Sequence, residues 1–343
     1  MKKYLAMLEA IFRSRRENKT HDSLIVFNGY RSVILGGSSS YSEGVNHEVC
    51  KRTGTEIVRA ESVSRKIIYE DEGSLNIAFI AHASALKSKA ERYIPVLSEY
   101  EAINEAILEG LKNYNMTFKS SPECLCIGNS KLVETLPYWF YDYLMYHAVI
   151  HLDTNLENYK RILSHEALKE KGEITSLALE LGRKLRSEVV LKEIVRGVRK
   201  QLNINFENST LTSEEKALAD KLYRVKYSRM EWVKNRKAPF LSGMGKTTVE
   251  IFVAYPPTSK GRELIKTVKE AISGFDDKVE VKVWMRGRGL SQHGENAEMS
   301  PALRMAEKAN IIPAVIINGE LKFKEDIPDV NMLRKAIIKA VYL

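Results

Sequence analysis

The feature that most constrains the fold is a break in the pattern of the chain at residues 237–246 (KAPFLSGMGK). Proline and glycine interrupt a long helical stretch there, which is typical of a boundary between structural units. The order of strand-like and helix-like stretches also differs on the two sides of the break. We therefore expect two domains, at residues 1–239 and 247–343, each long enough to bury its own core.

The segment before the break mixes short apolar runs with amphipathic stretches in irregular order. This order favours an α+β fold with a mostly antiparallel sheet over a doubly wound parallel one. We expect strands at residues 24–27, 32–35, 56–59, 66–69, 75–80, 123–127 and 143–152, and helices at residues 1–16, 90–114 and most of 155–236. Ser213 is expected to cap a helix that begins at Glu214.

The segment after the break alternates regularly between the two patterns. We expect strands at residues 248–253, 279–284 and 314–317, and helices at residues 261–273, 301–310 and 330–341. Ser300 followed by Pro301 is a typical helix start, because proline suits the first helical turn.

The 343-residue chain carries a formal net charge of +9. Its basic residues are mixed with glutamate along helical stretches, so we expect mostly solvated helix faces, no nucleic acid, and an acidic protein as the partner that the charge favours. No run of about 18 apolar residues and no cleavable leader is evident, so we expect no membrane partner. Three cysteines are too few for a disulfide framework, which predicts a cytoplasmic protein.

The histidines His147 and His151 would share one strand face with Asp153, an arrangement that suggests a metal site. Residues four apart on a strand are roughly 13 Å apart, too far for both rings to bind one ion. We expect no metal, and a structural or substrate-facing role for His147. Cys124 and Cys126 also share a strand face, and free cysteines are most often small buried apolar residues.

Four partial motifs follow one another before the break. Residues 32–62 (SVILGGSSSYSEGVNHEVCKRTGTEIVRAES) contain a strand with a glycine turn, a helix and a second strand. Residues 67–79 (IIYEDEGSLNIAF) are similar to A-V-Y-H-D-x-G-N-L-N-x-S-F, and residues 146–157 (YHAVIHLDTNLE) to H-H-G-T-L-L-x-D-x-D-L. Residues 211–239 are similar to L-T-x-E-E…K-Y-x-s-x-E-W. Over residues 1–239 the chain thus resembles the lipoate–protein ligases of the biotin/lipoate ligase catalytic-domain family.

This resemblance implies a mixed sheet flanked by helices and a definite reaction. A lipoyl or octanoyl carboxylate is activated with ATP as an acyl-adenylate and is then passed to a lysine of a lipoyl carrier domain. The implied ligands are ATP and lipoate, with Mg²⁺ as an optional companion. The implied partners are an acidic lipoyl carrier domain and, in addition, a second ligase subunit.

Lys131 takes the position of the family's catalytic lysine when residues are counted back from His147 without gaps. A cation there would stabilise the negative charge on the acyl carbonyl and phosphate. The family's S-G-S-A-Q after this lysine is replaced by Val-Glu-Thr-Leu-Pro. The resemblance implies roles in binding substrate or acyl-adenylate for Arg59, Asp71, Gly73, Asn76 and His147.

The sequence departs from the family where a Ser-Gly-Gly-Gly segment is expected, because Val63-Ser64-Arg65-Lys66 stands there. We favour the interpretation that Arg65 and Lys66 fill space used by the acyl chain, with phosphate contacts as the alternative. Ala60 replaces the second arginine of the family's pair. Aromatic residues crowd positions 138–143, where they could roof an apolar tunnel, although packing in the core or at a partner surface is the commoner reason.

The last hundred residues resemble thioredoxin-like α/β domains, in the strand–loop–helix of residues 249–272 and in the segment IIPAVIING at 311–319. The resemblance implies that Pro313 is the cis-proline. A Cys-x-x-Cys motif is expected near residues 257–261, but no cysteine follows Cys126. Thiolate chemistry is therefore excluded in this domain.

The function predicted from the sequence is that of a lipoate–protein ligase-like acyltransferase. Two alternatives remain open. One is a non-catalytic binding protein with a degenerate ligase fold. The other is a cysteine-dependent octanoyltransferase, which needs an exposed Cys124 or Cys126 of lowered pKa.

Overall fold

The computed structural model describes residues 1–62, 64–86, 97–140, 142–239, 241–242, 245–274, 276–287, 289–290 and 299–342. The chain divides into two compact units, Met1–Lys237 and Ala238–Leu343, and each has sheets of its own. Val63, Tyr141 and the first part of the helix expected at residues 90–114 lie outside the described residues.

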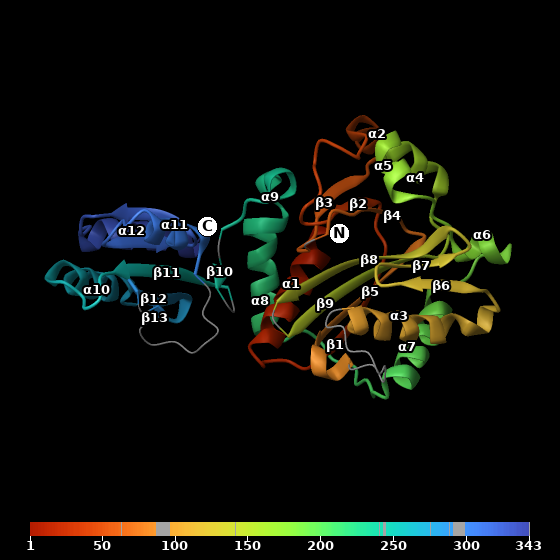
Figure 1. The fold of residues 1–343 in the computed structure, drawn as a ribbon, viewed down its shortest axis with the longest axis horizontal. Helices are drawn as coiled ribbons and strands as arrows, with labels where there is room; N and C mark the ends of the chain where they lie inside the picture. The colour runs from red at the N-terminus through yellow and green to blue at the C-terminus, as the bar shows by residue number, and fades with distance from the viewer. Residues whose placement is uncertain are drawn as a thin grey trace. The chain divides into compact units, whose positions relative to one another are not determined.

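The first unit is built around a six-stranded sheet in which all neighbouring strands are antiparallel (Figure 1). Its strands, in spatial order, are β1 (Ser23–Asn28), β5 (Ser74–His82), β9 (Tyr143–His151), β8 (Ser130–Phe140), β7 (Cys124–Ile127) and β6 (Phe118–Ser121). A separate three-stranded sheet joins β3 (Glu56–Arg59), β2 (Ser32–Leu35) and β4 (Ile67–Glu70), with β2 and β3 parallel. The expected α+β class is confirmed, with two sheets in this unit.

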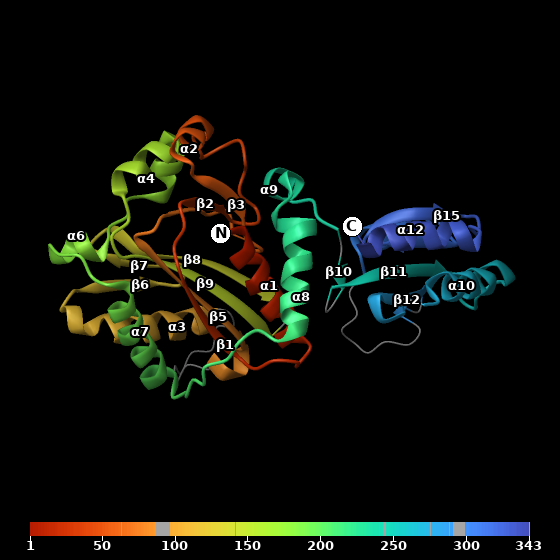
Figure 2. The same cartoon turned by 180° about the vertical axis from the view of Figure 1, so that it is seen from behind.

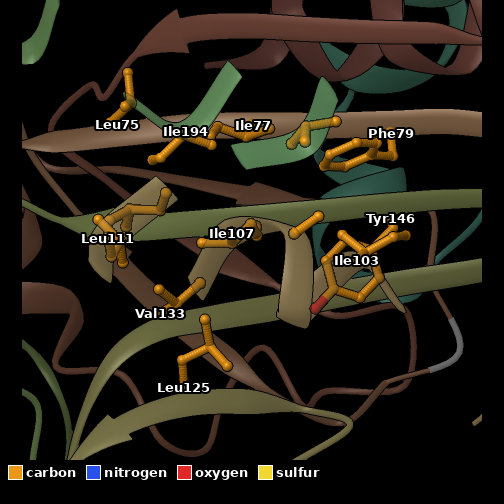
Figure 3. Packing of buried hydrophobic residues seen from close by; sticks show 14 of the residues in the cluster. Leu75, Ile77, Phe79, Ile103, Ile107, Leu111, Leu125, Val133, Tyr146 and Ile194 are labelled. Carbon is orange, nitrogen blue, oxygen red and sulfur yellow. The ribbon is translucent and has the colours of Figure 1, made fainter. Parts of the chain in front are cut away.

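One face of the large sheet is covered by α3 (Leu97–Leu111) and α7 (Ser187–Leu202), as Figures 1 and 2 show. Ile103 and Ile107 of α3 and Ile194 of α7 pack on Ile77 and Tyr146 of the sheet (Figure 3). The two helices approach closely where Gly110 meets Gly197. A Cβ atom on Gly197 would lie 2.2 Å from the backbone nitrogen of Gly110, so this crossing requires glycine.

The opposite face of the large sheet carries α1 (Lys2–Arg16), which packs beside α8 (Ser213–Leu222). Leu8, Ile11 and Phe12 of α1 contact Ala78 and Met145 of the sheet. A short turn of helix, η3 (Tyr223–Tyr227), and α9 (Met230–Asn235) follow α8.

The N-cap of α8 corrects an expectation, because Thr212 and not Ser213 caps this helix. The Thr212 hydroxyl accepts from the backbone N–H of Glu215, and the Glu215 carboxylate accepts from that of Thr212. This reciprocal pair satisfies two helix-end donors, which a cap one residue later would not do.

The remaining elements of the first unit are short. They are α2 (His47–Thr53), η1 (Ala83–Leu86), η2 (Lys112–Tyr114), α4 (Leu156–Ile162), α5 (His165–Lys171) and α6 (Leu177–Leu181). The helical stretch expected over residues 155–236 is interrupted, because Asn203 ends α7 in the left-handed conformation and residues 204–212 form neither helix nor strand. Asparagine tolerates that conformation better than most residues.

The second unit has a sheet of order β13–β12–β11–β14–β15, with β10 also paired to β11. Its elements are β10 (Leu241–Ser242), β11 (Lys246–Val253), α10 (Ser259–Ile272), η4 (Asp276–Lys278), β12 (Val279–Met285), β13 (Gly289–Leu290), α11 (Pro301–Lys308), β14 (Ala314–Ile317), β15 (Glu320–Lys324) and α12 (Val330–Tyr342). Ser300 caps α11 as expected, and the Ile312–Pro313 peptide bond is cis. Over the described ranges, no helix is both long and apolar enough for a membrane span.

Candidate functional site

A buried polar relay crosses from the small sheet to the large one. The Ser32 hydroxyl donates to one carboxylate oxygen of Glu70 (2.7 Å), and the Asn76 side-chain amide donates to the other (2.6 Å). The Asn76 carbonyl oxygen lies 2.7 Å from Nε2 of His147. All four side chains are 0–2% exposed, so the relay is shielded from water.

The relay fixes the protonation of His147. Because the Asn76 amide nitrogen donates to Glu70, the Asn76 oxygen is left to accept, and Nε2 of His147 must carry the proton. Burial lowers the pKa of His147 to about 4, so the ring is neutral at pH 7. Burial raises the pKa of Glu70 to about 7, although the hydrogen bonds from Asn76 and Ser32 oppose that rise.

A small cavity opens beside His147, with room for about one water molecule (about 10 Å³). Its lining is mostly apolar and consists of Leu5, Leu8, Ala60, Glu61, Leu136, Met145, His147 and Tyr227. Within the part of the chain that the structure describes, Nδ1 of His147 has no hydrogen-bond partner. The relay therefore leaves His147, which lines this mostly apolar cavity, with an acceptor nitrogen that has no partner among the described residues.

A buried charge cluster closes the other side of this cavity. The Lys226 ammonium binds Glu9 at 2.6 Å and also pairs with Glu61, while Arg13 binds Glu9 at 2.6 Å. The Tyr227 hydroxyl donates to Glu9 at 2.7 Å. Burial by itself would raise the pKa of Glu9, but Lys226 and Arg13 outweigh it and lower that pKa to about 2.

Arg59 is buried at the end of β3, with only 2% of its surface exposed. Its guanidinium donates to the backbone carbonyls of Gly36, Gly37, Ser39 and Val233. These contacts tie the turn after β2 to α9, which contains Val233. In this conformation the arginine is directed at the protein's own backbone, which gives it a structural role beside the ligand-binding role predicted for it.

Asp71 and Gly73 form the turn between β4 and β5. The Asp71 carboxylate accepts from the backbone N–H groups of Gly73 (2.9 Å) and Asn155 (2.8 Å). A Cβ atom on Gly73 would lie 2.3 Å from the carbonyl oxygen of Asp153. Glycine is therefore required there by the close approach of the chain that follows β9, and both residues hold the turn that leads into Asn76.

Lys131 lies at the start of β8, paired through the backbone with Cys126 of β7. The thiols of Cys124 and Cys126 are 3.6 Å apart and half-buried. Burial, aided by Cys124, raises the pKa of Cys126 to about 11, although the Lys131 ammonium acts to lower it. A thiol of raised pKa is a poor nucleophile, which argues against Cys126 in the cysteine-dependent alternative.

The segment that replaces the expected glycines packs against the β2 turn. A Cβ atom on Gly37 would lie 1.7 Å from the carbonyl oxygen of Ser62, so the two backbones are in direct contact. The Lys66 ammonium donates to the carbonyls of Glu123 (2.8 Å) and Thr135 (3.3 Å) across β7 and β8, whereas Arg65 is exposed. Lys66 thus lies against β8, and the interpretation that Arg65 and Lys66 fill space used by the acyl chain stays a prediction.

The aromatic residues near position 140 pack on helices. Tyr138 meets Phe12 of α1 with ring centroids 5.4 Å apart, and Trp139 donates to the Tyr100 hydroxyl of α3 at 2.7 Å. The Arg16 guanidinium lies over the ring of Phe140. Packing between sheet and helices therefore accounts for these described residues.

The predicted site residues fall into three places. Asn76 and His147 are brought into direct contact, and the Asp71–Gly73 turn leads into Asn76. On β8, Leu136 is the residue that pairs with His147, and Lys131 lies five residues before Leu136. Lys131 is therefore roughly 16 Å from His147 along the sheet. Arg59 lies apart from both the Asn76–His147 group and Lys131.

Several polar residues of the site were not anticipated from the sequence. Glu70 stands inside a quoted motif, at the position where that motif has histidine, and this departure was the available signal. Glu9 and Lys226 are 217 positions apart, and no sequence pattern joins them. Among the described residues no three His, Cys, Asp or Glu side chains gather in a way that could hold a metal ion.

Comparison with known families and sequences places this geometry among acyl-handling proteins. A model of the lipoyl protein ligase A/B catalytic domain matches residues 1–199. The chain is 23% identical over 255 residues to octanoyltransferase LipM of Carboxydothermus hydrogenoformans, covering 67% of this chain and 93% of that one. It is also 23% identical over 245 residues to lipoate-protein ligase A subunit 1 of Thermoplasma acidophilum, covering 66% and 90%.

Solved structures share the fold. A bipartite lipoate protein ligase of Thermoplasma acidophilum, described with its E2 lipoyl domain, matches with a TM-score of 0.58 and 22% identity, over 71% of this chain and 91% of that one. A lipoate-protein ligase A bound with ATP matches with a TM-score of 0.59 and 21% identity, over 68% and 93%.

Proposed function

Because the chain belongs to the lipoyl protein ligase A/B catalytic-domain family, we propose that it transfers a lipoyl or octanoyl group to a lysine of a lipoyl carrier domain. The group is activated with ATP as the acyl-adenylate, as in the ligases that the chain resembles. The Thermoplasma relative is described with an E2 lipoyl domain and as one part of a two-part ligase. An acidic lipoyl domain and a second subunit are accordingly the partners that we propose, and the net charge of +9 would speed the encounter with the former.

The arrangement of Lys131 and the His147 cavity along β8 is the observation that carries this proposal. Roughly 16 Å of strand separates Lys131 from the level of His147. An extended octanoyl or lipoyl chain covers part of this distance, and the long side chain of Lys131 can reach over the rest. With its far end at the apolar cavity, its carboxyl end would lie near Lys131, whose ammonium would stabilise the negative charge that builds on the acyl carbonyl and phosphate. We assign no step to Mg²⁺, for which the described residues provide no ligand set.

The experiment measures ATP-dependent acylation of a purified lipoyl domain by wild type and by Lys131→Ala. Loss of the cation should lower the rate about a hundredfold, of order 3 kcal/mol of transition-state stabilisation. Lys192→Ala is the matched control, because Lys192 is an exposed lysine on α7, across the large sheet from the site. The control should retain the wild-type rate.

Equal rates for wild type and Lys131→Ala would contradict the role of the lysine. Absence of acylation by wild type, with a second ligase subunit also supplied, would contradict the proposed reaction.

A non-catalytic binding protein is the second candidate, and two observations favour it. The cavity has room for about one water molecule and would have to open for an acyl chain. Arg59 is committed to backbone carbonyls. In the same assay this candidate predicts no acyl-adenylate, while a lipoylated domain still binds.

The second unit remains part of the proposal as a thioredoxin-like docking domain. The parallel pair β11 and β12, joined through α10, and the antiparallel β14 and β15 support this reading. No cysteine lies in this unit, so it would be redox-inert. The three free cysteines of the chain suit the cytoplasm, which is the location that we propose.

A further inference from the structure

The cavity beside His147 has one unused polar atom. Its walls are mostly apolar, and the polar groups among its lining residues other than His147 already have partners. Glu61 pairs with Lys226, and the Tyr227 hydroxyl donates to Glu9. Nδ1 of His147 lacks a partner among the described residues, and the side chain is 2% exposed. A buried polar atom left unpaired is unfavourable, so this nitrogen calls for a donor that the protein does not supply.

The hydrogen bonds of Glu70 and Asn76 determine that the missing partner of His147 Nδ1 must be a donor. The Glu70 carboxylate can only accept while it is ionised, which orients the Asn76 amide and places the proton of His147 on Nε2. Nδ1 of His147, a residue that lines the cavity, then carries a lone pair without a partner among the described residues. A protonated Glu70 could also donate and would allow the other orientation of Asn76. Burial raises the pKa of Glu70 to about 7, so the tests of this inference are made at pH 8, where Glu70 is ionised. Glu70 and Asn76 are thus positioning residues for the ring of His147.

The cavity is also placed at the far end of the path proposed for the acyl chain, and the inference rests on that proposed function. Since Lys131 marks the carboxyl end, a chain extended along β8 brings its other end to Leu136 and His147. The thioether of Met145 in the lining is flexible, so it can adapt to chains of different shape.

From these observations we propose that the His147 cavity selects acyl chains whose far end donates a hydrogen bond. The dihydrolipoyl chain, which ends in thiols, fits this requirement. The lipoyl ring contains a disulfide and has no donor, and the octanoyl chain ends in a methyl group. Dihydrolipoyl and lipoyl differ only by two hydrogen atoms, so they are a matched pair for testing the acceptor. One net hydrogen bond corresponds to a preference of about threefold to tenfold.

The binding test compares dihydrolipoate, lipoate and octanoate by calorimetry with the full-length protein. Wild type should bind dihydrolipoate about threefold to tenfold more tightly than lipoate. His147→Leu should bind the two with equal affinity, since the acceptor is gone. Met145→Leu is the matched control, because it changes the cavity wall but keeps Nδ1, and it should retain the preference.

A second measurement does not depend on binding and remains available if His147→Leu fails to fold. Two-bond ¹⁵N–¹H correlation spectra of histidine-labelled wild type distinguish the ring tautomers. His147 should be the neutral Nε2–H form with an unprotonated Nδ1. His151 is the internal reference, because its Nδ1 lies 3.0 Å from Thr154 and its Nε2 lies 3.2 Å from Glu134.

The outcomes separate this inference from the proposed function. Equal affinities of wild type for dihydrolipoate and lipoate, or an Nδ1–H tautomer, would overturn the inference while acylation of the lipoyl domain could still be observed. A preference that persists in His147→Leu would also overturn it and would leave water as the occupant of the nitrogen. If none of the three acids binds and no acylation occurs, both the inference and the proposed function fail.

Discussion

Two buried glutamates are linked to residues that line the same small cavity, Glu9 to Tyr227 and Glu70 through Asn76 to His147, and their surroundings differ. Glu9 on α1 is 3% exposed and contacts the cations Lys226 and Arg13. Glu70 on β4 is fully buried and receives hydrogen bonds from the neutral Ser32 and Asn76. From an ordinary value of 4.5, the pKa of Glu9 falls to about 2 and that of Glu70 rises to about 7.

The difference shows that charged partners decide whether the effect of burial on a carboxylate pKa is reversed. Burial raises the pKa of both groups, and only the nearby cations reverse it at Glu9. The Glu9 cluster joins α1, η3 and Glu61 and so holds the cavity closed. The Glu70 relay holds no elements together by charge and instead orients one imidazole ring. The Glu9 cluster therefore stabilises the packing of the elements around the cavity, and the Glu70 relay determines which hydrogen-bonding group His147 offers.

The largest effect is expected from removing the cation of the first region. Lys226→Met removes a cation from both Glu9 and Glu61, and Glu9 keeps Arg13 as its cationic partner. Breaking a buried ion pair costs about 3–5 kcal/mol of unfolding free energy. Urea unfolding at pH 7 measures it. Lys216→Met, an exposed position on α8, is the control and should change stability by no more than about 0.5 kcal/mol.

The double variant Glu9→Gln/Lys226→Met tests the cause. It should recover part of the lost stability, because one uncompensated charge is gone. If it is as unstable as Lys226→Met alone, the loss came from packing against Trp232, over which the Lys226 ammonium lies at 4.1 Å.

The second prediction concerns acid, which should lower the contribution of the Glu9 cluster to the unfolding free energy. Since the folded pKa of Glu9 lies below its ordinary value, its contribution is complete above pH 4.5 and is lost as the pH falls toward 2. The difference between 4.5 and about 2 amounts to about 3 kcal/mol. The unfolding free energy of wild type should therefore fall more steeply below pH 5 than that of Glu9→Gln. Parallel profiles would mean that Glu9 titrates normally in the folded protein.

The second region should respond to pH in the opposite direction and by a similar amount. The folded pKa of Glu70 is raised, so its contribution is complete below pH 4.5 and is lost as the pH rises through 7. Ser32, Asn76, the backbone N–H of Tyr30 and the N-terminal ammonium face this carboxylate and oppose the rise. Glu70→Gln carries no charge, so it should lose about 3 kcal/mol less than wild type between pH 4 and pH 8. Unfolding curves at the two pH values measure this, and an identical loss in both proteins would be the contrary result.

Much of the fold could be predicted from the sequence where strands are apolar and bounded by turns. The strands β2 and β3 begin and end at the predicted residues, and the regular alternation of the second unit was confirmed. The strand β8 was missed, because Glu134 and Pro137 interrupt its apolar run and proline supplies no N–H to a sheet. The strand β15 was missed because it is short and largely exposed, and only Leu321 and Phe323 are apolar in it.

The candidate site was predictable only in part. Asn76 and His147 stand in two of the quoted motifs and do meet in the structure. The Glu9–Lys226 pair could not be found, because pairing of charges across 217 positions depends on tertiary packing alone. Glu70 was passed over because a single carboxylate in a strand more often points to solvent than into a relay.

The hydrogen bonds between β3 and α9 determine how short a fragment of the first unit can be while it keeps its contacts. Trp232 donates to the carbonyl of Arg59, and the Arg59 guanidinium donates to the carbonyl of Val233. The matched family segment ends at residue 199, before both partners and before Lys226. A recombinant fragment trimmed to that segment would expose the apolar side of α1. It would also leave Glu9 and Glu61 without the ammonium of Lys226. The shortest self-sufficient fragment for crystallisation or assay therefore has to extend through residue 237, so that residues 200–237 belong to the core of the first unit and not to a connector.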